Sequence, residues 1–132
     1  MKITKNKFGF FQLNPLPSST FLNNYYSKKY YQNLTSSTYQ KSYSDPELFL
    51  NTIEANVTDL IFNKYSNLKT KSLFDLGCGE GYYMCEMKKL NWNVKGLDFS
   101  NNGILNHNPK LLDYVVFGDL FENLDNLNEK FS

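Results

Sequence analysis

The stretch Ser72-Leu73-Phe74-Asp75-Leu76-Gly77-Cys78-Gly79-Glu80-Gly81-Tyr82-Tyr83 decides the fold of this chain. It opens with the apolar run 73–76, which is typical of a short buried strand. Three glycines at alternate positions follow, and apolar residues spaced by three after them indicate a helix. A strand, a glycine turn and a helix in this order form a cradle for a small molecule, because glycine turns sharply and presents no Cβ to a ligand. We expect free N–H groups at the helix start to face that ligand.

Two cofactor-binding patterns place glycines directly after a first strand. The dinucleotide fingerprint G-x-G-x-x-G needs its third glycine where the helix packs on the strand. Here that position is the bulky Tyr82, which makes an NAD-dependent oxidoreductase the weaker alternative. The spacing is instead G-x-G-x-G, preceded by Asp75. The run 75–81 (DLGCGEG) resembles motif I of class I S-adenosylmethionine-dependent methyltransferases.

Two further carboxylates follow at the spacing expected of a second and a third strand. Residues 92–98 read as a strand that ends in Asp98, 21 positions after Gly77. An acid at the end of that strand can accept two hydrogen bonds from a ribose diol. The run 96–100 (GLDFS) resembles the second motif of the family. A third strand over 114–117 is followed by 118–120 (GDL), which resembles the next one.

The resemblance covers residues 45–132 and implies an α/β fold. That fold is a Rossmann-like three-layer sandwich with a parallel sheet, truncated here after strand 3. The cofactor would be S-adenosyl-L-methionine, and the chain would transfer a methyl group to a small molecule or sugar-type acceptor. Asp75 would orient the loop and the methionine amino end, Asp98 would hold the ribose, Phe99 would flank the adenine, and Asp119 would lie near its amino group. The cofactor-binding residues that the resemblance implies are Asp75, Gly77, Cys78, Gly79, Gly81, Asp98, Phe99, Asp119 and Leu120.

No catalytic residue is assigned from the sequence. His107 is the single histidine of the chain. It lies between polar residues before a proline, where a solvated loop side chain is the expected interpretation rather than a catalytic base.

Residues 1–44 form a tyrosine-rich leader ahead of the core at 45–132. Within it we expect a short strand over 8–13, a turn over 14–20 and a short helix from 21, capped by Ser19 or Thr20. The leader is interpreted either as an arm whose rings pack on the domain or as a lid over cofactor and substrate. Stacking on RNA bases is disfavoured, because Lys and Arg are sparse.

The core begins with a helix over 45–65. Asp45 is expected as its N-cap, Pro46 as its first helical residue and Glu47 in its first turn. We expect its apolar face to pack on the sheet; that face comprises Phe49, Ile53, Val57, Leu60 and Ile61. Further along, Ser100 predicts a cap for a short helix to about residue 105, and 122–128 reads as a polar helix or turn.

The bulk properties narrow the class of protein. The 132 residues suffice for one domain. The net charge is +1, from 14 Lys and Arg against 13 Asp and Glu, which predicts neither a nucleic-acid nor an anionic-membrane partner. Two cysteines, Cys78 and Cys85, have no second Cys/His cluster, so no metal site is predicted. Free thiols, no signal peptide and no apolar run of the ~20 residues needed to span a bilayer together predict a cytoplasmic protein.

The resemblance implies strands 4 to 7 where this sequence stops at Ser132. In the family order 3-2-1-4-5-7-6, strand 1 would then be an unpaired apolar edge, which is unfavourable for a free monomer. We therefore expect an N-terminal fragment, a truncated product, or a chain completed by a partner. The alternative function is a catalytically incomplete fragment or binding module that retains half of a cofactor site.

Overall fold

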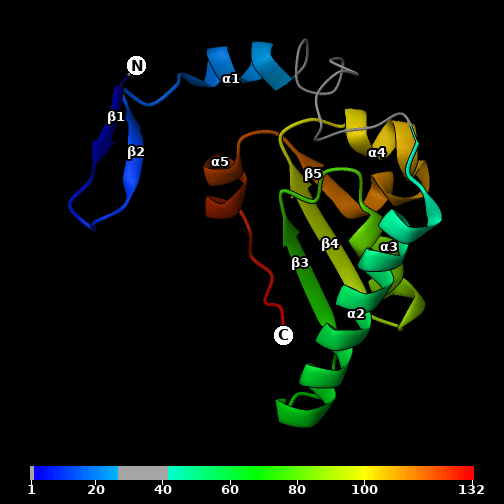
Figure 1. The fold of residues 1–132 in the computed structure, drawn as a ribbon. Helices are drawn as coiled ribbons and strands as arrows, with labels where there is room; N and C mark the ends of the chain where they lie inside the picture. Colours follow the sequence, from blue (N-terminus) through cyan, green and yellow to red (C-terminus); the bar gives the residue numbers. More distant parts are fainter. Residues whose placement is uncertain (1, 27–41) are drawn as a thin grey trace.

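A computed structural model of the chain describes residues 2–26 and 42–132. Its centre is a parallel sheet of order β3-β4-β5 (Figure 1). The three strands are β3 (Ser72–Leu76), β4 (Asn93–Asp98) and β5 (Val115–Phe117). In the register of the sheet, Leu73 lies opposite Val94 and Leu97 lies opposite Val116. The predicted α/β fold with a parallel sheet is confirmed, and each strand matches its predicted span to within one residue.

Right after each strand the chain turns into a helix, as the sequence pattern predicts. α3 (Tyr82–Lys89) links β3 to β4, and α4 (Asn102–His107) with a 3-10 helix (Pro109–Tyr114) links β4 to β5. α5 (Leu120–Asp125) follows β5. α4 begins one residue later than expected, with Asn101 rather than Ser100 as its N-cap, and ends about two residues later. α5 begins two residues earlier than expected. Apolar side chains from α3, α4 and the 3-10 helix are fully buried and form the core: Met84, Met87, Ile104 and Leu111.

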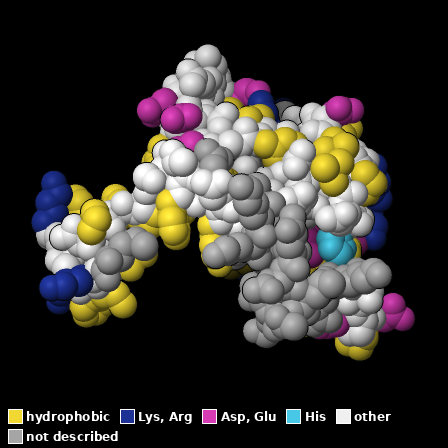
Figure 2. All heavy atoms as spheres, turned by 90° about the horizontal axis from the view of Figure 1, so that it is seen from above, with side chains coloured by type: hydrophobic (Ala, Val, Ile, Leu, Met, Phe, Trp, Pro, Cys, Tyr) yellow, Lys and Arg dark blue, Asp and Glu magenta, His cyan; other side chains and the backbone are white. Residues whose placement is uncertain are grey.

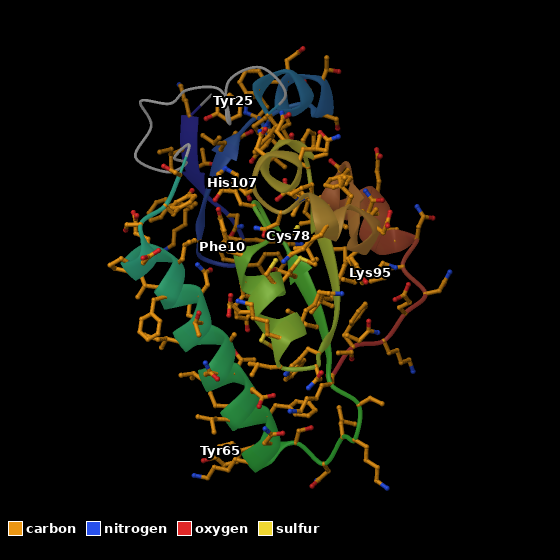
Figure 3. The ribbon with its side chains drawn as sticks, turned by 90° about the vertical axis from the view of Figure 1, so that its right-hand side faces the viewer. Phe10, Tyr25, Tyr65, Cys78, Lys95 and His107 are labelled. Carbon is orange, nitrogen blue, oxygen red and sulfur yellow. The ribbon has the colours of Figure 1, made fainter. Side chains whose placement is uncertain are left out.

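The sheet is covered on both faces. α2 (Asp45–Tyr65) and α3 lie on one side of it, and the C-terminal tail lies on the other (Figure 3). The ring of Phe131 stacks on that of Phe74 with centroids 4.9 Å apart. Lys95 of β4 forms an ion pair with Glu129 on the same side. Ser132 also exchanges hydrogen bonds with Ser72, so the tail follows β3 along its length.

The start of α2 differs from the prediction by one residue. Ser44, not Asp45, is the N-cap, because the Glu47 carboxylate accepts hydrogen bonds from both the N–H and the hydroxyl of Ser44. Asp45 instead lies in the first turn, where its charge stabilises the positive end of the helix dipole.

The prediction that the apolar face of α2 packs on the sheet is wrong. Phe49, Ile53, Val57, Leu60 and Ile61 are all exposed, with Leu60 68% exposed. A second set of side chains, on the opposite face, makes the contacts: Ala55 is fully buried, Thr58 accepts a hydrogen bond from Tyr83, Asp59 accepts one from Trp92, and the Phe62 ring packs on Trp92. Periodicity alone cannot tell which face a neighbouring helix will choose. Tyr83 of α3 and Trp92, which precedes β4, offer hydrogen-bond donors that favour the polar face.

The leader contains a hairpin that the sequence only half predicted. β1 (Lys2–Lys5) pairs antiparallel with β2 (Phe11–Asn14), so the expected strand over 8–13 is displaced toward its C-terminal end and its partner was missed. Figure 2 shows this hairpin as a lobe that projects from the rest of the molecule. α1 (Ser19–Tyr25) follows, and Ser18 accepts the hydrogen bond from the Phe21 N–H that was expected at Ser19 or Thr20. The leader tyrosines 30, 31 and 39 lie outside the described residues. In the described part of the chain, no helix has the length and apolarity to cross a membrane.

Candidate cofactor site at the carboxyl ends of the strands

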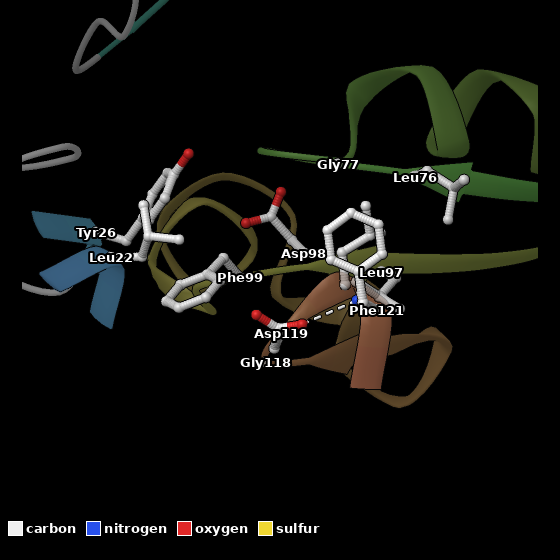
Figure 4. Close-up of a pocket in the computed structure, with 11 residues that line it drawn as sticks. Leu22, Tyr26, Leu76, Gly77, Leu97, Asp98, Phe99, Gly118, Asp119 and Phe121 are labelled. Carbon is white, nitrogen blue, oxygen red and sulfur yellow. Dashed lines mark hydrogen bonds between the residues drawn. The ribbon is translucent and has the colours of Figure 1, made fainter. Parts of the chain in front are cut away.

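A cleft of about 330 Å³ opens at the carboxyl ends of β3, β4 and β5 (Figure 4). Parallel sheets bind ligands at this edge, where the loops after successive strands meet. Five of the predicted residues line the cleft: Gly77, Asp98, Phe99, Asp119 and Leu120. The other four predicted residues, Asp75, Cys78, Gly79 and Gly81, are not part of its lining.

The glycine loop has the backbone conformation that its sequence predicts. Gly77, Gly79 and Gly81 have φ angles of 81°, 55° and 77°, a region that side chains with a Cβ disfavour. A Cβ built on Gly77 would meet no atom within 4 Å, so this residue borders open space in the cleft. The structure therefore leaves bare backbone where a ligand can approach it closely.

The N–H groups of this loop are not free. Those of Gly77 and Cys78 donate to the Leu97 carbonyl, that of Gly81 donates to the Cys78 carbonyl, and that of Gly79 donates to Asp98. The expectation of free N–H groups concerned the start of α3, which begins at Tyr82, and it stays a prediction. The bonds hold the loop against the end of β4, and access through the missing Cβ of Gly77 remains.

Asp98 connects the loop to the next strand. Its Oδ2 accepts the Gly79 N–H at 2.8 Å, and its Oδ1 accepts the Ser100 N–H at 3.1 Å. The residue is 7% exposed, yet its carboxylate borders the cleft (Figure 4). A carboxylate at the edge of a cleft can accept hydrogen bonds from the hydroxyl groups of a ligand.

Asp75 lies on the neighbouring strand β3, where burial and the charge of Asp98 affect its carboxyl. Burial first, and then the negative charge of Asp98, raise the pKa of the Asp75 carboxyl above its ordinary value of 3.8. Asp75 lies opposite Gly96 in the register of the sheet, and Asp98 is two residues further along β4, so the two acids lie on the same side of the sheet. Burial likewise raises the pKa of the Cys78 thiol to about 12, with Asp98 and Asp75 adding to the effect, so this thiol is neutral and unreactive at pH 7.

The raised pKa of Asp75 predicts a pH dependence of stability. The folded chain holds this proton to higher pH than the unfolded chain, so the carboxyl lowers the free energy of unfolding as pH rises from 3.8 through the raised pKa. We expect Asp75→Asn to raise the unfolding temperature at pH 7 and to flatten the pH profile above pH 3.8. Thermal melts between pH 3.5 and pH 8 measure both effects, with exposed Asp113→Asn as the control. A lower unfolding temperature for Asp75→Asn at pH 7 would contradict this account.

Asp119 and Phe99 form the floor of the cleft. Asp119 is the N-cap of α5, and its Oδ1 accepts the N–H groups of Phe121 and Glu122 at 2.9 and 3.2 Å. The sequence analysis did not predict that Asp119 caps this helix. Phe99 contacts the ring of Tyr26 with centroids 5.0 Å apart. The aromatic side chain expected to flank an adenine therefore already has one aromatic neighbour.

Six residues line the cleft that the sequence analysis did not assign to it: Leu22, Tyr26, Leu76, Leu97, Gly118 and Phe121. Four of them directly flank predicted residues at strand ends or in α5, and that adjacency is the signal that could have identified them. Leu22 comes from α1 and Tyr26 follows it, far from the core in sequence, and both close one wall of the cleft (Figure 4). The leader thus contributes two side chains to the wall of the cleft.

His107 is not the solvated loop residue that we expected. It is the last residue of α4, and its side chain is 12% exposed. Its Nε2 lies 3.0 Å from the Glu80 carboxylate, and its Nδ1 lies 2.9 Å from the Tyr82 hydroxyl. The Tyr82 side chain is bonded there and is absent from the lining of the cleft.

Two observations concern metals and thiols. Within residues 2–26 and 42–132, no group of three or more His, Cys, Asp or Glu side chains is placed to hold a metal ion. Cys78 and Cys85 are both buried and free, and the Cys85 thiol donates to the Asn108 side-chain oxygen at 3.1 Å.

Comparison with known proteins found only distant likeness. No protein-family model matches the sequence, and no curated protein matches it. Among solved structures, the chain is similar to Streptomyces venezuelae DesVI, with a TM-score of 0.40 and 22% identity over 59% of this chain and 37% of that one. It is also similar to a SAM dependent methyltransferase from Archaeoglobus fulgidus, with a TM-score of 0.40 and 22% identity over 66% of this chain and 40% of that one. The chain thus matches well under half of the length of either structure.

Proposed function

We propose that this chain binds S-adenosyl-L-methionine and acts as a methyltransferase toward a small molecule or sugar-type acceptor. The proposal rests on one observation: Asp98 and Gly77 line the same cleft. A carboxylate at the end of β4 borders the same cleft as a glycine whose missing Cβ leaves open space. A ribose diol can donate two hydrogen bonds to such a carboxylate, and the glycine lets the nucleoside lie against the backbone.

The cleft fits a nucleoside in size and chemistry. Its volume of about 330 Å³ is within the range of small-ligand sites, and most of its lining is apolar or aromatic. In this proposal Asp98 holds the ribose, Phe99 and Leu120 contact the adenine, and Asp119 lies near the adenine amino group. Asp75 orients the glycine loop and the methionine amino end, and Cys78, Gly79 and Gly81 set the shape of that loop.

The cofactor, when bound, supplies an electrophilic methyl group on sulfur. The residues of this chain have two tasks. They hold the reacting atoms in line at about 3 Å, and they exclude water from the site. Leu22 and Tyr26 cover the cleft from the leader side and contribute to the second task.

Calorimetry with S-adenosylhomocysteine tests the proposal. We expect a saturable heat and a higher unfolding temperature with the ligand present, because a ligand that binds only the folded state stabilises it. NADH in the same buffer is the control, and the bulky Tyr82 at the third fingerprint position predicts no heat for it. No heat and an unchanged melt with S-adenosylhomocysteine would count against cofactor binding by the chain.

A second candidate function rests on an exposed apolar helix face and an open strand edge. The apolar face of α2 is open to solvent, and within the described residues no strand pairs with the outer edge of β3. Contiguous apolar surface and open strand edges favour association with further polypeptide. On this account the chain is a catalytically incomplete module whose site is completed by a partner chain or by further sequence. The same calorimetry separates the two functions, because a half-site gives no saturable heat with the chain alone.

The cytoplasmic location remains a prediction, based on the free thiols.

A further inference from the structure

Four side chains form a hydrogen-bonded cluster beside the glycine loop that the cofactor site does not use. Glu80 comes from the loop, Tyr82 from the first residue of α3, His107 from the end of α4, and Tyr43 from the segment before α2. Glu80 is 9% exposed, although it is a carboxylate. A charged group at this depth calls for a reason, because its burial costs free energy unless it is paired.

In the cluster, the Glu80 carboxylate is bonded to the His107 imidazole, which is bonded in turn to the Tyr82 phenol. The Glu80 carboxylate accepts the Nε2–H of His107 at 3.0 Å and a hydrogen bond from the Tyr43 side chain. This fixes the tautomer of the neutral ring, so that Nδ1 is an acceptor, and the Tyr82 hydroxyl donates to it at 2.9 Å. A base oriented by a buried acid and hydrogen-bonded to a hydroxyl is the arrangement by which proteins remove protons.

The surroundings keep the Tyr82 phenol protonated. For Glu80, burial raises the pKa of the carboxyl, while the hydrogen bond from Tyr43 and the charge of His107 lower it. Burial raises the pKa of Tyr82, and the negative charge of Glu80 and the neighbouring Cys85 thiol add to this, so the phenol remains a donor at neutral pH. The rings of Tyr43, Tyr82 and His107 contact one another with centroids 5.5–5.8 Å apart, which holds the imidazole in place. Tyr82 as a whole is half-buried.

The cluster shares its backbone with the cofactor site. Glu80 and Tyr82 flank Gly81 in the same loop whose Gly79 N–H is bonded to Asp98. His107 ends the helix that begins four residues after Asp98. Asn108 ties that helix end to the loop by donating to the Glu80 carbonyl at 2.8 Å. A phenol oxygen is thus fixed to the loop that would carry the methyl donor.

We propose that Tyr82, His107 and Glu80 form a proton relay for the methyl acceptor, whose reacting group is an ionisable hydroxyl or amine. This inference rests on the proposed methyltransferase function. As the acceptor oxygen or nitrogen bonds to the methyl carbon, the carbon–sulfur bond breaks and its electron pair remains on sulfur. The acceptor proton passes to the Tyr82 oxygen, the Tyr82 proton passes to His107 Nδ1, and Glu80 stabilises the imidazolium that results.

The test uses 4-nitrophenol, an acceptor analogue whose phenolate is coloured. It is titrated against pH in the presence of the full chain and S-adenosylhomocysteine. We expect the pH of half-ionisation to fall by about one unit relative to free probe, which is a tenfold gain in ionisation. His107→Gln and Tyr82→Phe should abolish the shift. Tyr83→Phe is the matched control and should retain it, because the adjacent Tyr83 hydroxyl donates to Thr58 instead.

Two results would overturn the relay. One is an unshifted probe with the unsubstituted chain while S-adenosylhomocysteine still gives heat, a pattern that leaves cofactor binding intact and removes only the relay. The other is a nitrogen NMR spectrum of His107 in the unsubstituted chain that shows the Nδ1–H tautomer. The spectrum needs no variant, so it decides the matter even where a substitution prevents folding.

Discussion

Asp98→Asn lowers the affinity for S-adenosylhomocysteine by about 100-fold, the largest effect that we expect at the cofactor site. The carboxylate borders the cleft at the end of β4 and can accept both ribose hydroxyls. Hydrogen bonds to a charged group contribute about 1.5–3 kcal/mol each, and a loss of roughly 2.7 kcal/mol corresponds to 100-fold in affinity. In the native side chain, one carboxylate oxygen accepts the Gly79 N–H and the other accepts the Ser100 N–H. An asparagine has only one acceptor oxygen, so it can replace only one of these two acceptors and carries no charge for the ribose.

Calorimetry on the variant and on Asp125→Asn measures this prediction. Asp125 is an exposed acid in α5, so its neutralisation removes the same charge without touching the cleft. A circular dichroism melt of each variant separates lost binding from lost folding. If Asp98→Asn binds within threefold of the unsubstituted chain, the ribose does not lie at this carboxylate.

Gly103→Ala destabilises the fold by about 1–3 kcal/mol, the usual cost of overpacking a site that cannot relax. A Cβ at this position would lie 2.6 Å from the Gly79 carbonyl oxygen and 2.9 Å from its carbon. Both are backbone atoms of the glycine loop, so no side chain can move aside. Asn108 also holds α4 against the loop by its bond to the Glu80 carbonyl, which limits the movement of the helix.

Thermal denaturation gives the result directly, as a fall in Tm of roughly 5–10 °C. Asn106→Ala is the control in the same helix, because its side chain is exposed and alanine favours helix. A Tm for Gly103→Ala within one or two degrees of the control would show that the loop and α4 are free to separate. Such freedom would also weaken the case for a preformed cofactor cradle.

The packing roles of two glycines, Gly96 and Gly103, were not predicted from the sequence. Gly96 was read as part of a motif, but its physical role is to leave room for Cys78 and Met84, whose sulfur atoms lie 2.8 Å from a Cβ built there. Gly103 received no interpretation. Both needs arise where distant parts of the chain meet, and no local pattern encodes them.

The sequence by itself determined the three strands, the glycine loop, the span of α2 and the placement of Asp98 and Asp119 at one edge of the sheet. These features are local: short apolar runs end in carboxylates, and parallel strands bring their carboxyl ends together. Only the tertiary structure decided that α2 turns its polar face to α3, that α1 reaches the cleft, and that His107 lies between Glu80 and Tyr82. His107 and Tyr82 are 25 positions apart in the chain. The folded backbone sets the distance between such residues, and sequence spacing does not.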